Sequence, residues 1–277
     1  MFLGAALSAA AAYGILCLLV YTRQASLVYF PERAVRVKPA DVGLPVREVE
    51  LTTEDGERLR AWAIPPEDPR AGWILFSHGN GGNMSLRLER ALVLRRCGVG
   101  LLMYDYRGYG ESTGTPSEEG LARDAEAAWR WLVDDQGIPA GRVVLMGESL
   151  GGGVTTGLAA RHRPAAMILE STFTSAVDLG AEVYPWLPVR LLSRHRFPSR
   201  DRLAGMDFPK LFMHSPQDDV IPYHHGRELF EAAPEPKEWA DLVGGHNAGT
   251  AAQGPGYVRT VSDFLRRSVG APLQEPD

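Results

Sequence analysis

Six short, continuously apolar segments, alternating with longer segments of helical periodicity, constrain the fold of this chain most strongly. These segments lack the polar–apolar alternation of a half-exposed sheet, so each is typical of a strand covered on both faces. Strands that alternate with helices predict an α/β fold, a mostly parallel sheet flanked by helices. The predicted strands are 72–78, 98–106, 142–148, 165–171, 209–215 and 237–243, and the predicted helices are 84–96, 117–134, 150–161, 225–232 and 257–268.

Two segments depart from this alternation of strands and helices. Residues 47–65 alternate polar and apolar side chains around the turn EDGE, which predicts an antiparallel hairpin at the leading edge of the sheet. After the strand that ends at residue 171, about 35 residues, 172–206, precede the next strand. Excursions of this length in compact α/β domains usually serve as lids or binding loops, so we predict a lid insertion at about 172–206.

The chain opens with an uncharged apolar run. No charged side chain occurs from Phe2 to Thr22, and about 20 helical residues at ~1.5 Å each just cross the hydrocarbon core of a bilayer. A secretory signal has a positive region before the apolar run, but here Phe2 follows Met1 directly. A core helix of a soluble protein presents a polar face, which this run lacks. We therefore predict a single-pass membrane anchor over 1–22 that contacts membrane lipid.

The distribution of charge bears on topology and on partners. A formal net charge of −5 provides no basic footprint, so nucleic acid is not a predicted partner. The apolar run and the strand–helix pattern together divide the chain into four parts. These are an anchor at 1–22, a connector at 23–45, an α/β domain at 46–270 and a tail at 271–277. The positive-inside rule favours a cytoplasmic position for the main domain, because four basic residues follow the span closely and none precedes it: Arg23, Arg33, Arg36 and Lys38.

A serine between glycines lies at the carboxyl end of the strand 142–148. Residues 147–151 read GESLG, a G-x-S-x-G pattern with a strand before it and a helix after it. Side chains two positions either side of a serine on such a tight turn would collide, so Gly147 and Gly151 let the Ser149 hydroxyl project into the open. The context makes Ser149 a candidate nucleophile, because chemistry in open α/β sheets gathers at the carboxyl ends of strands.

A serine hydroxyl needs a base to act as a nucleophile at neutral pH. His246 lies in the glycine-bracketed loop LVGGHNAG after the last strand, late enough to close the chain order serine, acid, histidine. His214 ends a strand and is predicted to be structural, and His224 and His225 adjoin a helix start, where solvated histidines are common. His162 and His195 lie at a helix end and in the lid, so His246 is the predicted base.

The third member of such a set is an acid at the end of the preceding strand. The segment PKLFMHSPQDDVIP offers Asp218 and Asp219, and only one of the two carboxylates is expected to face His246. An oxyanion hole needs two backbone donors, and the N–H of Leu150, which follows the nucleophile, is one. The loop SHGNGGN places the N–H of Asn80 as the second, whereas a phosphate-binding loop would require G-x-G-x-x-G spacing or a lysine.

These motifs together resemble the α/β-hydrolase superfamily of serine hydrolases, and within it the membrane-anchored group that includes protein depalmitoylases. The resemblance covers roughly residues 27–264 and rests on these stretches: LVYFP (27–31), SHGNGGN (77–83), YDYRGYGESTGTPSEEGLARDAEAAWRWL (104–132), GESLGGG (147–153), HSPQDDVIPYHHGRELF (214–230) and GGHNAG (244–249).

The resemblance implies specific roles for residues of this chain. It implies Ser149 as nucleophile, Asp218 rather than Asp219 as acid, His246 as base, and the amides of Asn80 and Leu150 as the oxyanion hole. It also implies no cofactor and no metal. The chain departs from the pattern in two places, since relatives usually have glycine at the position of Ser215 and an acidic residue at that of Ala248. Asp105 and Arg107 are expected to be structural ion-pair partners, since buried charges need partners.

The predicted activity is hydrolysis of carboxylic ester or thioester bonds through an acyl-enzyme, with a small-molecule or acylated substrate. The lid carries apolar side chains that are expected to form an acyl pocket: Phe173, Tyr184, Trp186, Leu187, Leu191 and Leu192. It also carries arginines that would face anionic lipid or remain a solvated surface: Arg190, Arg194, Arg196, Arg200 and Arg202. The alternatives are a membrane-anchored pseudoenzyme or scaffold, a peptidase, a C–C hydrolase and a cofactor-free peroxidase.

Overall fold

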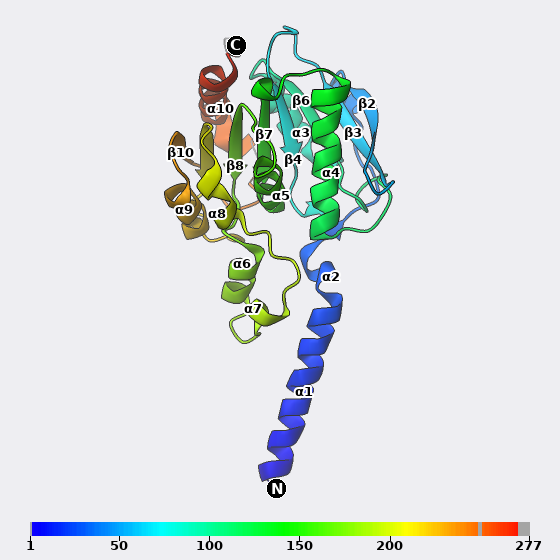
Figure 1. Ribbon diagram of the computed structural model, residues 1–277, viewed down its shortest axis with the longest axis vertical. Helices are drawn as coiled ribbons and strands as arrows, with labels where there is room; N and C mark the ends of the chain where they lie inside the picture. Colours follow the sequence, from blue (N-terminus) through cyan, green and yellow to red (C-terminus); the bar gives the residue numbers. More distant parts are fainter. Residues whose placement is uncertain (1, 249–250, 271–277) are drawn as a thin grey trace.

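An eight-stranded sheet forms the centre of the molecule in the computed structural model, which describes residues 2–248 and 251–270 (Figure 1). The strand order is β10-β9-β8-β7-β4-β6-β3-β2, with β3 antiparallel to both of its neighbours and all other pairs parallel. The predicted α/β fold and its leading hairpin are therefore confirmed. The strands are β2 (Arg47–Thr52), β3 (Arg58–Ile64), β4 (Trp73–Ser77), β6 (Gly100–Tyr104), β7 (Val143–Glu148), β8 (Ala166–Glu170), β9 (Lys210–His214) and β10 (Lys237–Asp241).

The central strands are continuously apolar because helices cover both faces of the sheet. Along β4, the side chain of Leu75 joins one core, whereas those of Ile74 and Phe76 join the other. Helices α4, α5 and α9 contribute to the first core, and α3 and α10 contribute to the second. These helices are α3 (Leu88–Arg95), α4 (Glu118–Arg130), α5 (Leu150–Ala159), α9 (Tyr223–Ala232) and α10 (Gly254–Val269), with short 3-10 turns at Pro39–Val42, Met84–Arg87, Ala140–Arg142, Leu203–Gly205 and Ala251–Gln253.

Two predicted helices begin or end differently from expectation, for local reasons. The side chain of Asn83 accepts the N–H of Ser85, so the segment predicted as a helix from 84 starts with the 3-10 turn and becomes α3 only at Leu88. The segment predicted from 117 is capped by Ser117, whose side chain accepts the N–H of Gly120. Its last residues form a π turn, Trp131–Asp135, instead of continuing α4.

The N-terminal helix α1 (Phe2–Arg23) projects from the domain beside the predicted lid (Figure 1). By length and composition it could cross a membrane, and none of its residues is buried. The lid segment contains α6 (Ala176–Val183), α7 (Val189–Leu192) and α8 (Ser199–Arg202). The Tyr13 hydroxyl of α1 donates a 2.7 Å hydrogen bond to the carbonyl of Trp186, so the lid contacts the middle of α1. The predicted tail 271–277 lies outside the described residues.

Candidate active site

The turn between β7 and α5 holds Ser149 in a backbone conformation with φ 53° and ψ −119°. A positive φ in a residue other than glycine stores about 1–3 kcal/mol of strain and is common at functional sites. A Cβ added at Gly147 would lie 2.3 Å from the carbonyl oxygen of Gly151, and one at Gly151 would lie 1.9 Å from that of Ser77. The predicted steric reason for the two glycines is thus confirmed, and the backbone at the end of β4 supplies the second obstacle.

Ser149, His246 and Asp218 converge above the carboxyl ends of the strands. His246 Nε2 lies 3.0 Å from Ser149 Oγ, and His246 Nδ1 lies 2.8 Å and 3.0 Å from the two carboxylate oxygens of Asp218. The three side chains that the sequence predicts to meet therefore lie within hydrogen-bond distance of one another. With the imidazole proton donated from Nδ1 to Asp218, Nε2 is free to accept the serine proton, which is the arrangement that activates a serine nucleophile.

The two adjacent acids contact different parts of His246. The side chain of Asp218 is fully buried and faces the imidazole, whereas Asp219 is exposed and its Oδ1 accepts the backbone N–H of His246 at 2.9 Å. The carboxylate of Asp218 also accepts hydrogen bonds from the backbone N–H groups of Val220 and Ile221. The structure therefore decides the choice that the residues alone left open: Asp218 faces the imidazole, and Asp219 holds the loop.

Several donors keep Asp218 ionised. Burial alone would raise its pKa, but hydrogen bonds from His214, His246 and the amides of Ile221 and Val220 outweigh burial and hold the pKa below its usual value. His214 is buried, and its Nε2 lies 3.3 Å from Asp218 and 2.9 Å from the carbonyl of Ile221. This position agrees with the prediction that His214 is structural.

Substitution of the two acids should separate their roles. Asp218→Asn is expected to lower kcat by about 10⁴-fold, because an amide cannot stabilise the imidazolium or hold the required tautomer. Asp219→Asn retains an oxygen that can accept the His246 N–H, so its effect should stay below about tenfold. Initial rates on an activated ester would measure both effects, and equal losses in the two variants would contradict this assignment.

The loop that carries Asn80 lies directly against Ser149. A Cβ added at Gly79 would lie 3.5 Å from the Cβ of Ser149, so the residue before Asn80 is in van der Waals range of the serine. Tyr109 donates its hydroxyl to the carbonyl of Asn80 at 2.9 Å. This hydrogen bond holds the Asn80 backbone, and Leu150, which carries the other predicted donor, begins α5.

The predicted connector also holds this loop. After the short helix α2 (Ala25–Val28), the strand β1 (Phe30–Pro31) pairs in parallel with β5 (Gly81–Gly82). The Asn80 side chain donates to the carbonyl of Val28 at 3.1 Å, and the carbonyl of Asn80 accepts the N–H of Phe30 at 3.1 Å. The segment after α1 therefore holds the loop that carries Asn80, whereas the sequence had predicted only a connector there.

A buried network of charges underlies the site and was not predicted. Arg90 of α3 makes a bidentate pair with Glu170 at 2.7 Å for each bond, and its Nε lies 3.2 Å from Glu148, which precedes the nucleophile. Tyr257 of α10 donates to Glu170 at 2.7 Å. The signal in the sequence was a glutamate at the end of each of two continuously apolar strands, because a charge at the end of a buried strand needs a partner.

The guanidinium groups keep Glu148 charged beside the nucleophile. Burial opposes its ionisation, but Arg90 and Arg87 outweigh burial and hold the pKa of its carboxyl below the usual value. A cavity of about 300 Å³ opens next to this network. Its wall comprises Leu86, Arg87, Glu89, Arg90, Glu148, Glu170, Ser171, Ser215, Leu242, Val243, Gly245, His246, Asn247 and Gln253.

The lid side chains do not form the expected acyl pocket. Over the described residues, the wall of the cavity beside His246 includes none of the six apolar lid residues. Phe173 is buried in the core of the domain instead, while Tyr184, Trp186 and Leu191 are exposed. The expectation was wrong because composition shows only that apolar residues are present, whereas the path of the chain decides where they point.

Most of the lid arginines are engaged by other side chains. Arg190 pairs with Asp178 at 2.9 Å, and Arg200 pairs with Glu228 of α9 at 3.0 Å. The guanidinium of Arg194 lies 5.0 Å from the ring centre of Tyr21 in α1. These arginines therefore connect the lid to itself, to the domain and to the N-terminal helix.

Other candidate residues have structural partners. Arg107 pairs with Asp124 and Asp55 at 2.8 Å each, and Asp105 accepts the N–H of Met84 at 2.6 Å, so both charges are structural as expected. The prediction that His224 and His225 are solvated was half wrong. His224 is exposed, whereas His225 is buried because Thr174 and the lid cover it.

Comparison with known proteins agrees with the fold and identifies the class. The family described as serine aminopeptidase, S33 matches residues 68–203. The α/β hydrolase domain-containing protein WAV2 of Arabidopsis thaliana is 32% identical, and the alignment covers 88% of this chain and 88% of that protein. The chain therefore belongs to the α/β-hydrolase superfamily, and its coarse function is that of a hydrolase.

More particular similarities lie within that superfamily. The protein Rv2307c of Mycobacterium tuberculosis is 40% identical over 95% of this chain and 92% of its own length, and bem46 of Schizosaccharomyces pombe is 31% identical over 89% and 87%. Among solved structures, the Pyrococcus furiosus esterase Pf2001 has a TM-score of 0.74 at 20% identity, covering 88% of this chain and 98% of that chain. At that identity the structural likeness shows the fold.

Proposed function

We propose that this chain is a membrane-anchored serine hydrolase that cleaves carboxylic ester or thioester bonds through an acyl-enzyme intermediate. The observation that carries the proposal is the chain of contacts from Ser149 Oγ through His246 to the Asp218 carboxylate, at 3.0 Å and 2.8 Å. A nucleophile, a base and an orienting acid within hydrogen-bond reach of one another are the parts that acyl transfer requires.

The reaction would proceed in two halves at one site. Ser149 Oγ attacks the acyl carbon while its proton passes to His246 Nε2, and the carbonyl oxygen becomes an oxyanion held by the N–H groups of Asn80 and Leu150. His246 returns the proton to the leaving alcohol or thiol as the acyl–oxygen or acyl–sulfur bond breaks. Water, deprotonated by His246, then attacks the acyl-enzyme and releases the acid and the free serine.

The surroundings of the site support a lipid-like or acylated substrate. The charged cavity beside His246 suits the polar part of an ester, because an apolar chain gains little among Arg87, Glu148 and Glu170. The lid beside α1 exposes apolar side chains, including Trp186 at 57% and Leu191 at 86%, and such a surface suits contact with acyl chains.

The position of α1 supports membrane attachment. Gln24, the residue that follows α1, donates to the carbonyl of Leu192 at 3.2 Å and accepts the N–H of Arg194 at 2.7 Å, so the chain and the lid are joined where α1 leaves the proposed span. In this proposal the part of the lid that contacts α1 enters the membrane beside it, because Trp186 lies against Tyr13 in the middle of the span. The domain is cytoplasmic, because the basic residues that follow the span favour the inner side.

Labelling with a fluorophosphonate probe tests the proposal. In sealed membrane vesicles that display their cytoplasmic face, the probe should modify Ser149, identified by mass spectrometry of the peptide, and the labelled chain should resist carbonate extraction. Protease added outside should digest the labelled domain. Purified protein should then hydrolyse p-nitrophenyl esters and acyl thioesters.

Distinct outcomes would overturn distinct parts of this proposal. A folded protein that takes no label would indicate a pseudoenzyme or scaffold, whereas labelling with turnover of amides alone would indicate a peptidase. Labelling without acyl hydrolysis would point to a C–C hydrolase or a peroxidase. Protection of the domain from protease would refute a cytoplasmic position but would not bear on the proposed reaction.

A further inference from the structure

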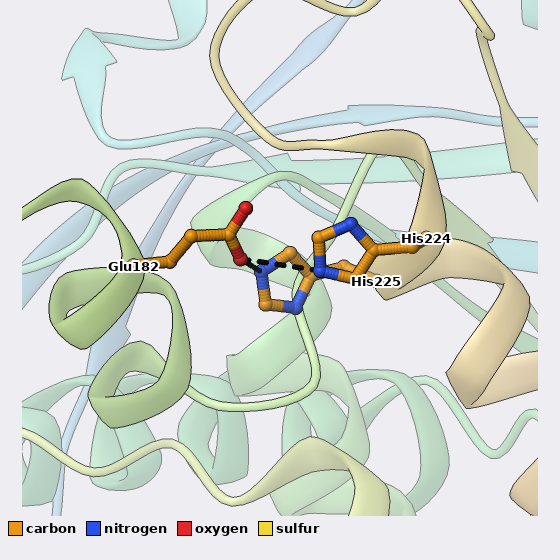
Figure 2. Close-up of side chains that lie close together, drawn as sticks. All are labelled: Glu182, His224 and His225. Carbon is orange, nitrogen blue, oxygen red and sulfur yellow. Dashed lines mark ion pairs between the residues drawn. The ribbon is translucent and has the colours of Figure 1, made fainter.

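Three potential metal ligands meet where the lid touches the domain. Glu182 lies on α6 of the lid, and His224 and His225 lie in the first turn of α9 (Figure 2). Glu182 Oε2 lies 3.1 Å from His224 Nε2 and 3.4 Å from His225 Nε2, and the three ligand atoms all lie within 4.8 Å of one another. The cluster is separate from Ser149, His246 and Asp218, so it does not depend on the proposed function.

The buried member of this cluster has an unused nitrogen. His225 is 2% exposed, and within the described residues its Nε2 has no hydrogen-bond partner although the carboxylate of Glu182 is near. Its Nδ1 lies 2.8 Å from the hydroxyl oxygen of Thr174 and accepts that residue's backbone N–H at 3.3 Å. A metal on Nε2 requires Nδ1–H to donate to the hydroxyl, the nearer of these two partners, whereas without a metal Nε2 carries the proton and faces Glu182.

We propose that Glu182, His224 and His225 bind a divalent transition-metal ion of the zinc class. Two imidazole nitrogens and one carboxylate oxygen form a known zinc ligand set that leaves a fourth position for water. Bond lengths of about 2.0–2.2 Å in a tetrahedron place ligand atoms about 3.4 Å apart, close to the two separations from Glu182. His224 is half exposed, so its ring can rotate to complete the site.

The metal would connect the lid to the domain. Arg200 of the lid already pairs with Glu228 of α9 at 3.0 Å, and α9 directly follows the loop that carries Asp218. An ion held by α6 and α9 together would add a second connection between the lid and α9. The site is therefore assigned a structural role in holding the lid, and the nitrogen-containing ligand set selects Zn²⁺, Ni²⁺ or Co²⁺ over Mg²⁺.

Metal binding to the full-length chain tests this inference. The protein is purified in detergent without a histidine tag, stripped with a chelator and titrated with Zn²⁺ against a chromophoric indicator. One equivalent should bind, and at 100 times the Kd the Tm should rise by roughly 5 °C or more, since binding to the folded state alone shifts unfolding. Mg²⁺ at the same concentration should leave the Tm unchanged.

Variants of exposed residues keep the test interpretable. Glu182→Gln and His224→Gln should each weaken Zn²⁺ binding by more than about 100-fold, because loss of an outer partner alone costs 10–100-fold. Glu228→Gln, which removes an exposed carboxylate of the same helix, should bind Zn²⁺ like the unmodified chain. Absence of a bound equivalent, or equal affinity in all four proteins, would overturn the proposal and leave a metal-free cluster with the proton on His225 Nε2.

Discussion

Ser149→Ala should abolish hydrolysis, lowering kcat by roughly 10⁶-fold, to a rate set by binding and the oxyanion donors alone. The reason is chemical, since the substitution removes the one atom that forms the acyl-enzyme while leaving His246 and Asp218 in place. Its structural effect should be small, because alanine is as compatible as serine with the backbone at φ 53°. Steady-state rates on an activated ester, with the Tm of each protein, measure both quantities.

A matched serine variant provides the control for this experiment. Ser268 lies on α10 and its hydroxyl donates to the carbonyl of Phe264 in the same helix, so Ser268→Ala should retain full activity. Pre-steady-state kinetics add a second criterion, because a burst of released alcohol reports acyl-enzyme formation in the unmodified protein. If Ser149→Ala kept a tenth or more of the activity, the nucleophile would have to be another residue.

Arg90→Met should cause the largest loss of stability, about 3–5 kcal/mol of unfolding free energy. The substitution leaves the carboxylates of Glu170 and Glu148 buried without their main partner, and an uncompensated buried charge is costly. In a protein of this size that loss corresponds to a fall in Tm of roughly 10 °C. Urea and thermal unfolding of the full-length chain in detergent would measure the change.

Two comparisons test the cause of that loss. Arg95→Met removes an arginine from the same helix, but its guanidinium is 38% exposed and lies 3.8 Å from Glu67, so the loss should stay below about 1 kcal/mol. The double variant Arg90→Met with Glu170→Met should recover part of the stability, since apolar replacement of a buried pair is often tolerated. An Arg90→Met protein as stable as the unmodified chain would show that leaving Glu170 and Glu148 without Arg90 does not destabilise the fold.

The parts of the site that could be predicted leave local traces in the sequence. A covered parallel strand is continuously apolar, and a nucleophile turn requires glycines at fixed spacing, so Ser149 was identified from a few residues. His246 followed from chain order and a glycine-bracketed loop. The choice between Asp218 and Asp219 needed either the resemblance or the coordinates, because adjacent residues share the same sequence signals but point in different directions.

The parts that could not be predicted depend on contacts between distant segments. The pairing of Arg90 with Glu170 joins a helix to a strand, and no periodicity links the two residues. The cluster of Glu182, His224 and His225 likewise joins the lid to α9, and its histidines look like ordinary residues at a helix start. The lid illustrates the same limit. Its apolar residues were expected to line an acyl pocket, whereas in the structure Phe173 lies in the core and Trp186 and Leu191 are exposed.

The sequence by itself determined the α/β layers, the apolar N-terminal helix, the strained serine turn and the order of the reactive groups, because each depends on spacing along one or two elements. Only the tertiary structure decided which acid faces His246, that a charged cavity lies beside it, and that the lid contacts α1. Those outcomes depend on the directions of side chains brought together by the sheet, and directions in space are not encoded in local periodicity.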